Sequence, residues 1–352
     1  MMTLSFVKIL LPWLVSFGFG ILIAPIVINY LNRYQAWKKK PGNEKGMGDD
    51  NGTPIFNKMH KDRDVKTPRM GGLVIVLSVI ITTLFFWLFS YAGAGDPSGV
   101  FDYLSRSQTW LPFAAFIAGG LMGFIDDYFT IKPNGLWKGG LPLQYRYIWV
   151  SLIAAGAAYW FYFKLGVESV FVPFYGDLFL GLLFIPFFML VFVSVFSTSI
   201  IDGLDGLSGG IMAIVFAAMG VIAYTQNQID ISAFSLVIVG GILAFLWFNI
   251  PPARFYMTEV GYNALSFALV IIAFLTDTVI LLPIIAFMLF ITLAANVLQV
   301  LSKKIRGKKI FLVAPIHHHF EALGWPAHQV VMRYWIISLI AASLGVILAL
   351  VS

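Results

Sequence analysis

Long apolar windows, separated by shorter polar segments, are the feature that most constrains how this chain can fold. Several windows hold more than about 18 predominantly apolar residues, the length that a helix needs to cross the hydrocarbon core of a bilayer. Only 11% of the residues are charged, against about 25% in soluble proteins. We therefore predict an all-α polytopic integral membrane protein whose single transmembrane domain covers residues 1–352, with about ten spans. The expected spans are residues 5–31, 70–93, 110–129, 147–164, 178–200, 210–225, 233–250, 262–275, 279–302 and 331–351.

Lysine and arginine are distributed very unevenly between the two sides of this predicted bundle. The loops 32–69, 130–146, 251–261 and 303–330, with the adjoining helix ends, hold 20 of the 23 basic residues (10, 3, 1 and 6). Positively charged loops of membrane proteins face the cytoplasm. We therefore predict that these four loops are cytoplasmic and that both termini are periplasmic.

The longest polar segment, residues 38–66, leads into a glycine-containing motif. The segment is expected to be a solvated loop, and the alternative is a lid or a collar that attracts anionic lipid headgroups. Thr67-Pro68 is predicted to cap a helix and to fill its first position. Gly71-Gly72 is expected to let two backbone segments approach closely. The positive end of this helix would then face the cytoplasm, where it could hold phosphate.

Acidic residues are scarce, and a group of them falls at the predicted cytoplasmic boundary together with three histidines. These residues are Asp126, Asp127, Asp202, Asp205, Glu259 and His317–His319. Neighbouring carboxylates raise one another's pKa unless a cation intervenes, and magnesium prefers such oxygen ligands. Adjacent residues on a helix point in different directions, so the two neighbouring aspartates are expected to do different jobs. Ionisable residues at membrane depth are usually functional, which predicts an active site at this face.

Each motif also has a simpler interpretation. An Asp-Asp pair can end a helix in solvent, an Asp-Gly-Leu-Asp turn can cap the next helix, and a histidine loop can lie at the interface or bind metal adventitiously. Their coincidence on one face favours a site, and two classes of protein then remain. A proton-coupled transporter would place ionisable groups near the bilayer midplane, whereas an enzyme transferring a phosphoryl-linked group would gather them at the surface. The nearly uncharged membrane interiors favour the enzyme.

Motifs spread along nearly the whole chain resemble those of one enzyme family. They are Thr-Pro-x-Met-Gly-Gly at 67–72, Gly-Phe-Ile-Asp-Asp-Tyr at 123–128, Asp-Gly-Leu-Asp-Gly-Leu at 202–207, Phe-Asn-x-Pro-Pro-Ala at 248–253, and Ala-Pro-Ile-His-His-His-Phe-Glu at 314–321 with Gly-Trp-Pro at 324–326. Together they resemble the phospho-N-acetylmuramoyl-pentapeptide transferases, which belong to the superfamily of polyprenyl-phosphate sugar-1-phosphate transferases. The histidine motif resembles the mark that separates this family from relatives using N-acetylglucosamine substrates.

The resemblance implies a ten-helix membrane enzyme, usually a homodimer, whose active site faces the cytoplasm of a bacterium. The enzyme would sit in the inner membrane and carry out the first membrane step of peptidoglycan synthesis. It would transfer phospho-MurNAc-pentapeptide from UDP-MurNAc-pentapeptide to undecaprenyl phosphate, giving lipid I and UMP, with Mg²⁺ as cofactor. No nucleic acid is expected among its partners. A related transferase that uses a different UDP-sugar is the alternative within this superfamily.

The resemblance also implies roles for single residues. Asp126 matches the candidate base or nucleophile toward the lipid phosphate or pyrophosphate, and Asp127 and His317 complete the expected catalytic group. Glu259 and Asp202 would bind the metal. The expected substrate-binding residues are Thr67, Arg146, Ser199, Asp205, Asn249, Tyr256, His318 and His319. Among these, Asn249 matches a nucleotide-site asparagine, and Tyr256 occupies a position where an aromatic ring stacks on uracil.

Some positions depart from the family pattern. The family usually carries two asparagines where this chain has Phe196 and Ser199, and a lysine where it has Arg146. The family motif Gly-Asp-Thr-Gly reads Thr-Glu-Val-Gly at 258–261, so Glu259 replaces an aspartate. Arginine offers a planar fork where lysine offers a point charge. The departures predict an active but divergent member, and they leave an altered substrate or an inactive paralogue as alternatives.

Overall fold

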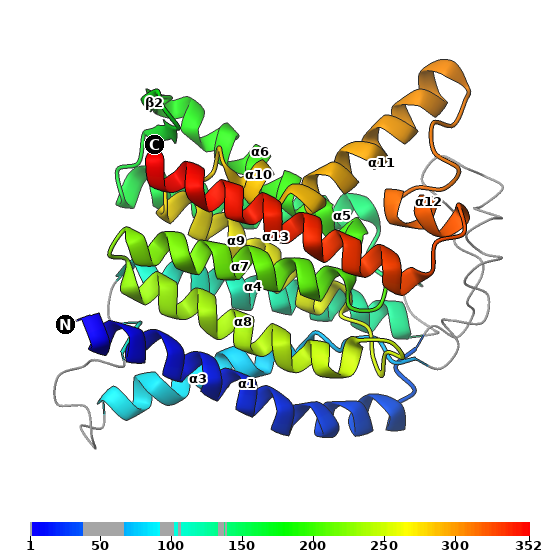
Figure 1. Cartoon of the computed structure of the whole chain (residues 1–352), viewed down its shortest axis with the longest axis horizontal. Helices are drawn as coiled ribbons and strands as arrows, with labels where there is room; N and C mark the ends of the chain where they lie inside the picture. The colour runs from blue at the N-terminus through cyan, green and yellow to red at the C-terminus, as the bar shows by residue number, and fades with distance from the viewer. Residues whose placement is uncertain (1, 38–66, 92–101, 105–106, 133–136, 138) are drawn as a thin grey trace.

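The computed structural model describes residues 2–37, 67–91, 102–104, 107–132, 137 and 139–352, and its fold is a bundle of long helices (Figure 1). The first helices are α1 (Met2–Arg33), α3 (Leu73–Tyr91), α4 (Ser107–Ile131), α5 (Leu143–Tyr159) with the π-helical turn η1 (Trp160–Lys164), and α6 (Phe184–Ser197) between the short turns η2 (Gly181–Leu183) and η3 (Thr198–Ile201). The others are α7 (Leu207–Thr225), α8 (Ile229–Asn249), α9 (Thr258–Leu275), α10 (Leu282–Ile285), α11 (Phe287–Arg306), α12 (Ile316–Ala322) and α13 (Ala327–Val351). Within the described residues, nine helices are long and apolar enough to cross a membrane, which confirms the predicted all-α polytopic class.

The predicted span at residues 147–164 differs from the other nine. It corresponds to α5, which has 17 residues and continues into the π-helical turn η1. This helix is not among the nine membrane-length helices of the described chain. The α-helix ends at Tyr159, where the π-helical turn begins, so its 17 residues, with Gln144 and Arg146 in the first turn, are fewer than the roughly 20 of an ordinary span.

A short antiparallel hairpin follows η1, and the sequence analysis did not predict it. Strand β1 (Ser169–Val172) pairs with β2 (Gly176–Phe179) in the only sheet found among the described residues. The β-branched and aromatic residues of β1 favour an extended backbone, and Gly176, with φ of +95°, helps the chain to turn. The span expected at residues 178–200 therefore begins later, at Gly181.

The helices run between two ends of the bundle that differ in content. Both chain termini lie at the same end (left in Figure 1), which we call the terminal end. Helix α12 lies at the opposite end, as do the C-terminal ends of α1, α4, α8 and α11 (Figure 1). We call this opposite end the site end, because the acidic and histidine motifs lie there.

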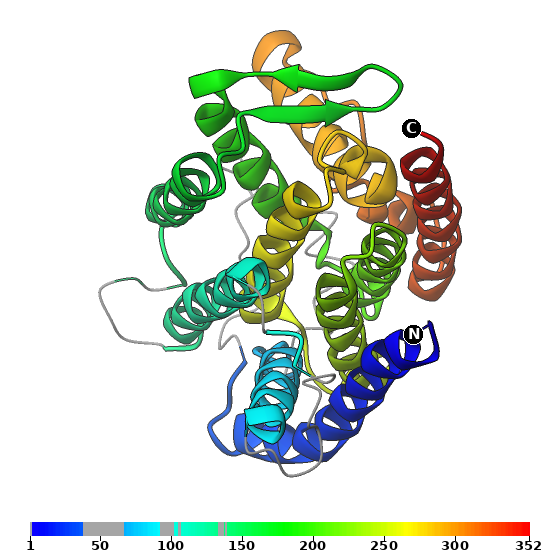
Figure 2. The ribbon, with the colours of Figure 1, turned by 90° about the vertical axis from the view of Figure 1, so that its left-hand side faces the viewer.

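Helix α9 forms the centre of the bundle, as the view from the terminal end shows (Figure 2). Except for Glu259 and Leu275, all of its residues are buried. Helix α4 packs directly on it through glycines: an added side-chain carbon at Gly119 or Gly123 would collide with the backbone of α9. Small residues allow membrane helices to pack this closely. The close contact brings the last turns of α4 to the first turn of α9.

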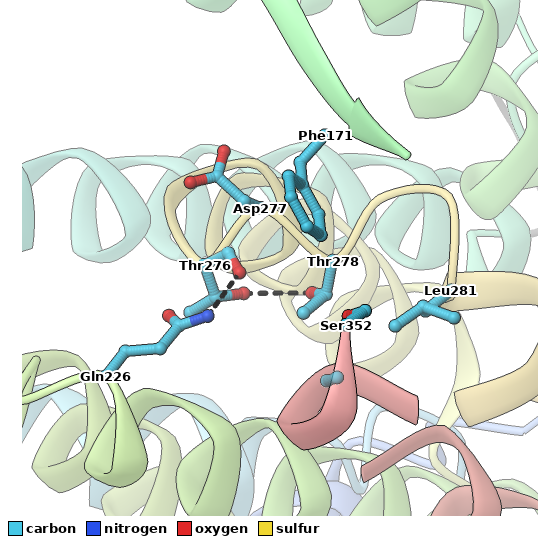
Figure 3. A pocket seen from close by; sticks show the side chains of 8 residues that line it. Phe171, Gln226, Thr276, Asp277, Thr278, Leu281 and Ser352 are labelled. Carbon is cyan, nitrogen blue, oxygen red and sulfur yellow. Dashed lines mark hydrogen bonds between the residues drawn. The ribbon is translucent and has the colours of Figure 1, made fainter. Parts of the chain in front are cut away.

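A small cavity of about 210 Å³ lies at the terminal end, away from these motifs (Figure 3). It is lined by Phe171, Gln226, Thr276, Asp277, Thr278, Leu281, Ala349 and Ser352. The side-chain amide of Gln226 donates to the carbonyl oxygen of Thr276 (2.8 Å), and the hydroxyl groups of Thr276 and Thr278 are 2.9 Å apart. These bonds join α7 to the end of α9 and satisfy the polar groups of this turn.

Candidate active site

The two neighbouring aspartates near the end of α4 have different partners. The Asp126 side chain is 2% exposed; its Oδ1 accepts a hydrogen bond from Leu141 N (2.7 Å), and its Oδ2 lies 2.9 Å from Arg146 Nη2. The Asp127 side chain is fully buried, and its Oδ2 accepts from Thr258 Oγ1 (2.6 Å) and Val260 N (3.0 Å). Asp127 is therefore held on the start of α9, whereas Asp126 faces α5. The divergence expected for adjacent helical residues is confirmed.

Arg146 links three helices at the site end. From α5 its guanidinium reaches Asp126 on α4 and, through Nη1, Glu259 Oε1 on α9 (3.2 Å), while its Nε donates to the Leu141 carbonyl oxygen (2.9 Å). The other carboxylate oxygen of Glu259, Oε2, is buried and has no hydrogen-bond partner among the described residues. The planar fork of arginine suits this bridging better than the point charge of lysine.

Thr258 connects two of the carboxylates. Its N–H donates to Asp202 Oδ2 (3.0 Å) and its hydroxyl donates to Asp127. The φ angle of Thr258 is +57°, which is unusual for a β-branched residue and costs on the order of 1–3 kcal/mol. Asp202 also accepts from Ser208 Oγ. Burial raises the pKa of Asp202, while the Ser208 hydroxyl, the Thr258 N–H and the positive charge of Arg69 oppose that rise.

The glycine-containing motif at 67–72 pairs with the segment before α9. Tyr256 N donates to Pro68 O (2.9 Å), Gly71 N to Tyr256 O (2.7 Å) and Gly72 N to Met257 O (3.1 Å). Side-chain carbons at Gly71 and Gly72 would collide with the atoms of residues 255–261. The predicted close approach of two backbones is thus confirmed.

The predicted helix cap at Thr67 is wrong. Helix α3 begins at Leu73, and the preceding chain turns at Met70, where φ is +67°. The backbone pairing with residues 256–257 keeps residues 68–72 out of the helix, and proline at position 68 disfavours helix at the residue before it. Thr67 therefore does not start α3, although it lies beside the site segment. The predictions for residues 38–66, a solvated loop, a lid or a collar, lie outside the described residues.

The histidine motif forms α12, and two of its three histidines are buried. His317 is 0% and His318 3% exposed, and both rings face Gly203, since a side-chain carbon there would meet their Nε2 atoms. His318 Nδ1 lies 2.6 Å from Glu321 Oε2. His319 points elsewhere: its Nδ1 accepts from Leu312 N (3.2 Å) in its own loop. The structure thus brings His317 and His318, but not His319, against the Asp202 loop.

The remaining predicted residues lie around the same loop. Asn249 Oδ1 accepts from Gly206 N (2.9 Å), and its Nδ2 donates to Phe255 O (2.8 Å), so this buried amide ties the loop to the segment before α9. Asp205 and Tyr256 are partly exposed at this end. Ser199 lies in η3, where its carbonyl oxygen accepts from Asp202 N (3.0 Å).

Comparison with known proteins shows the family to which the chain belongs. Residues 109–277 match the family described as glycosyl transferase family 4. The chain is 34% identical over 341 residues to phospho-N-acetylmuramoyl-pentapeptide-transferase of Bacillus subtilis (strain 168), covering 96% of this chain and 97% of the relative. The chain belongs to the phospho-N-acetylmuramoyl-pentapeptide-transferase family. Relatives of the same name from Bacillus velezensis (33% over 339 residues; 96% and 97% covered) and Anoxybacillus flavithermus (36% over 285 residues; 80% and 83% covered) agree.

The structure gives physical reasons for the departures from the pattern of the phospho-N-acetylmuramoyl-pentapeptide transferases. Arg146 and Glu259 form an ion pair with each other, so the two changes are matched in charge. Phe196, where an asparagine is usual, is buried against the rings of Tyr147 and Phe267. Thr258 stands where the family motif has glycine, and its positive φ explains why glycine suits that position.

The donor atoms at the site end fit a divalent metal ion, which such transferases typically need. Two buried carboxylate oxygens, Glu259 Oε2 and Asp126 Oδ2, accept no hydrogen bond from the described residues, although the latter contacts Arg146. Both oxygens of Asp202 already accept hydrogen bonds. No group of three or more acidic, histidine or cysteine residues in the described chain could hold a metal alone. Magnesium usually takes one or two carboxylates together with water and substrate phosphates, which this donor set allows.

Sequence reasoning missed two residues of the cluster. Arg69 lies 3.5 Å from Asp127, and Thr258 joins Asp127 to Asp202. Arg69 could have been noticed as a basic residue next to the Met-Gly-Gly turn. Thr258 could not, because its role depends on a left-handed backbone and on partners far away in sequence.

Proposed function

We propose that this protein transfers phospho-MurNAc-pentapeptide from UDP-MurNAc-pentapeptide to undecaprenyl phosphate, giving lipid I and UMP in the bacterial inner membrane. One observation carries the proposal: four carboxylates and two buried histidines lie together at one end of a bundle of membrane-length helices. These residues are Asp126, Asp127, Asp202, Glu259, His317 and His318. The relatives' shared name supports the same reaction.

In this proposal Asp126 positions or deprotonates the lipid phosphate. An oxygen of that phosphate attacks the β-phosphorus of the UDP substrate, so that a new phosphorus–oxygen bond forms. The bond from the β-phosphorus to the bridging oxygen breaks, and UMP leaves with that oxygen and the bonding electrons. A two-step route, in which Asp126 attacks first, remains open: trapping a phosphorylated Asp126 would exclude the single-step route.

The surrounding side chains would bind the two substrates. Asp127, fully buried and hydrogen-bonded, would fix the end of α4 against α9. His317 would act beside the transferring phosphate, with His318 lining the sugar region. Tyr256 would stack on uracil. The other proposed binding residues are Thr67, Ser199, Asp205, Asn249 and His319, while Arg146 would position Asp126 and Glu259 beside the substrates.

Glu259, with help from Asp202, would hold Mg²⁺. The bound ion would neutralise the pyrophosphate and stabilise the charge that develops during transfer. The oxygen Glu259 Oε2 supports this role because it is buried without a described hydrogen-bond donor.

Glu259→Gln is expected to raise the Mg²⁺ concentration for half-maximal activity at least about tenfold, because an amide oxygen carries no net charge to attract the ion. The same variant should lose the rise in melting temperature that Mg²⁺ gives the wild type, which is a readout independent of turnover. Glu168→Gln, an exposed glutamate of the terminal end, is the matched control and should keep both responses. An unchanged Mg²⁺ response in Glu259→Gln would remove this residue from the metal site.

The proposal also assigns an orientation and an assembly. The site end, with the loops 32–69 and 303–330, would face the cytoplasm, and both termini would be periplasmic. The scarcity of basic residues elsewhere supports this orientation, and the terminal end includes Lys8, which is paired with Asp230 (2.7 Å). A homodimer is proposed from the family resemblance.

The direct test is UMP release by purified protein with UDP-MurNAc-pentapeptide, undecaprenyl phosphate and Mg²⁺. We expect release with this nucleotide and none with UDP-N-acetylglucosamine. The opposite preference would assign the protein to a sister family of sugar-1-phosphate transferases.

A further inference from the structure

Arg69 is the residue at the variable position x of the motif Thr-Pro-x-Met-Gly-Gly. Its backbone is fixed on both sides, since Arg69 N donates to Ala36 O (2.7 Å) and Met70 N donates to Thr258 Oγ1 (3.1 Å). These bonds tie it to the end of α1 and to the start of α9. The backbone, rather than contacts of its own side chain, therefore places Arg69 beside the carboxylates.

The guanidinium group of Arg69 makes few contacts with the residues that the structure describes. Its Nη2 lies 3.5 Å from Asp127 Oδ1, which is the outer limit of a hydrogen bond. Its Nε is buried, and none of the described residues accepts a hydrogen bond from it. A buried donor without an acceptor is unfavourable in free energy. The Arg69 side chain as a whole is 21% exposed, so a ligand at the site end could approach it and supply the missing acceptor.

Arg146 provides the contrast. Its Nε donates to Leu141 O, its Nη1 to Glu259 and its Nη2 faces Asp126, all within 3.2 Å. Every nitrogen of this guanidinium contacts a protein oxygen, through a hydrogen bond or an ion pair, so Arg146 is already committed to holding the two carboxylates. Of these two arginines, only Arg69 has an unused buried donor.

We propose that Arg69 binds a phosphate group of a substrate through Nε and one terminal nitrogen, and that Arg146 positions Asp126 and Glu259. The inference rests on the proposed function, in which both substrates carry phosphate: the pyrophosphate of the nucleotide-sugar and the phosphate of the lipid. A guanidinium fork matches two oxygens of such a group. Either phosphate would supply the acceptor that the described residues do not provide.

The test is Arg69→Gln, with the KM measured separately for each substrate. Loss of a charged hydrogen bond to phosphate should raise one KM by about 10- to 100-fold. If the nucleotide supplies the phosphate, the Kd for UDP rises by the same factor while the Kd for uridine is unchanged. If the lipid supplies it, the Kd for UDP is unchanged and the KM for undecaprenyl phosphate rises.

Matched variants separate binding from structure. Arg254→Gln removes an exposed arginine of the site end, whose guanidinium lies over the Phe248 ring, and should change neither KM nor the Kd for UDP. Arg69→Lys keeps the charge without the fork and should restore part of the lost affinity. Arg146→Lys should lower kcat while both KM values stay within about twofold, the sign of a group that acts on the transition state.

An Arg69→Gln protein whose two KM values and Kd for UDP match the wild type would overturn the inference, whatever its kcat or melting temperature. The proposed function fails by a different result, namely a wild-type protein that releases no UMP from UDP-MurNAc-pentapeptide. The comparison of UDP with uridine still reports on Arg69 in that case, because it needs no turnover.

Discussion

Asp126→Asn is expected to lower kcat by about 10²- to 10⁴-fold, the usual contribution of a group that moves a proton. Asparagine keeps the shape of the side chain, so its amide oxygen can still accept the hydrogen bond from Leu141 N. It cannot accept a proton or carry the negative charge that faces Arg146. The loss should therefore appear in kcat for UMP release, with little change in the Kd for UDP.

The matched control is Asp277→Asn, which makes the same chemical change at an exposed aspartate of the terminal end. Asparagine tolerates the positive φ of that position, +52°, and activity should be unchanged. Full activity of Asp126→Asn, with a normal control, would show that the proton acceptor lies elsewhere and that Asp126 has no central role.

Gly123→Ala is expected to impair both stability and activity without altering a polar group. A side-chain carbon at Gly123 would collide with the carbonyl group of Glu259 and with Val260. Forcing a methyl group into such a contact costs about 1–3 kcal/mol. Helix α4 must move away from α9, which displaces Asp126 and Asp127 from their partners, and a shift of about 1 Å can lower kcat by about 10²-fold.

Gly156→Ala is the control, because a side-chain carbon at this position of α5 meets nothing within 4 Å. Alanine stabilises a helix by up to about 1 kcal/mol more than glycine does. The Gly156→Ala variant should therefore be at least as stable as the wild type. The measurements are the melting temperature in one detergent and kcat for UMP release. If Gly123→Ala matched Gly156→Ala in both, close packing of α4 on α9 would not be what organises the site.

The membrane-spanning helices and the acidic cluster were predictable because each corresponds to a local sequence pattern. Apolar length marks a span, and Asp126-Asp127 and Asp202 stand out in a chain with few charges. The close approach at Gly71-Gly72 was predictable for the same reason, since paired glycines permit it. Local sequence patterns thus identified the elements of the site and the end of the bundle where these elements meet.

The remaining features depend on tertiary contacts that no local pattern reveals. Helix α3 starts at Leu73 rather than at Pro68 because the preceding residues pair with the backbone of residues 256–257. The left-handed Thr258 persists because Asp127 and Asp202, both distant in sequence, bind it. The hairpin β1–β2 replaced part of a predicted span, since a short apolar strand and a helix end look alike in sequence.

The start of α9 has a consequence for how the protein recognises anions. A helix N-terminus often serves as a ready phosphate site, because its free N–H groups and its dipole attract negative charge. Here the N–H groups of Thr258 and Val260 already donate to Asp202 and Asp127, so the protein's own carboxylates occupy that position. Phosphates of the proposed substrates would then be held by side-chain cations and the proposed metal rather than by the N-terminus of α9. Nucleotide affinity should accordingly depend strongly on ionic strength.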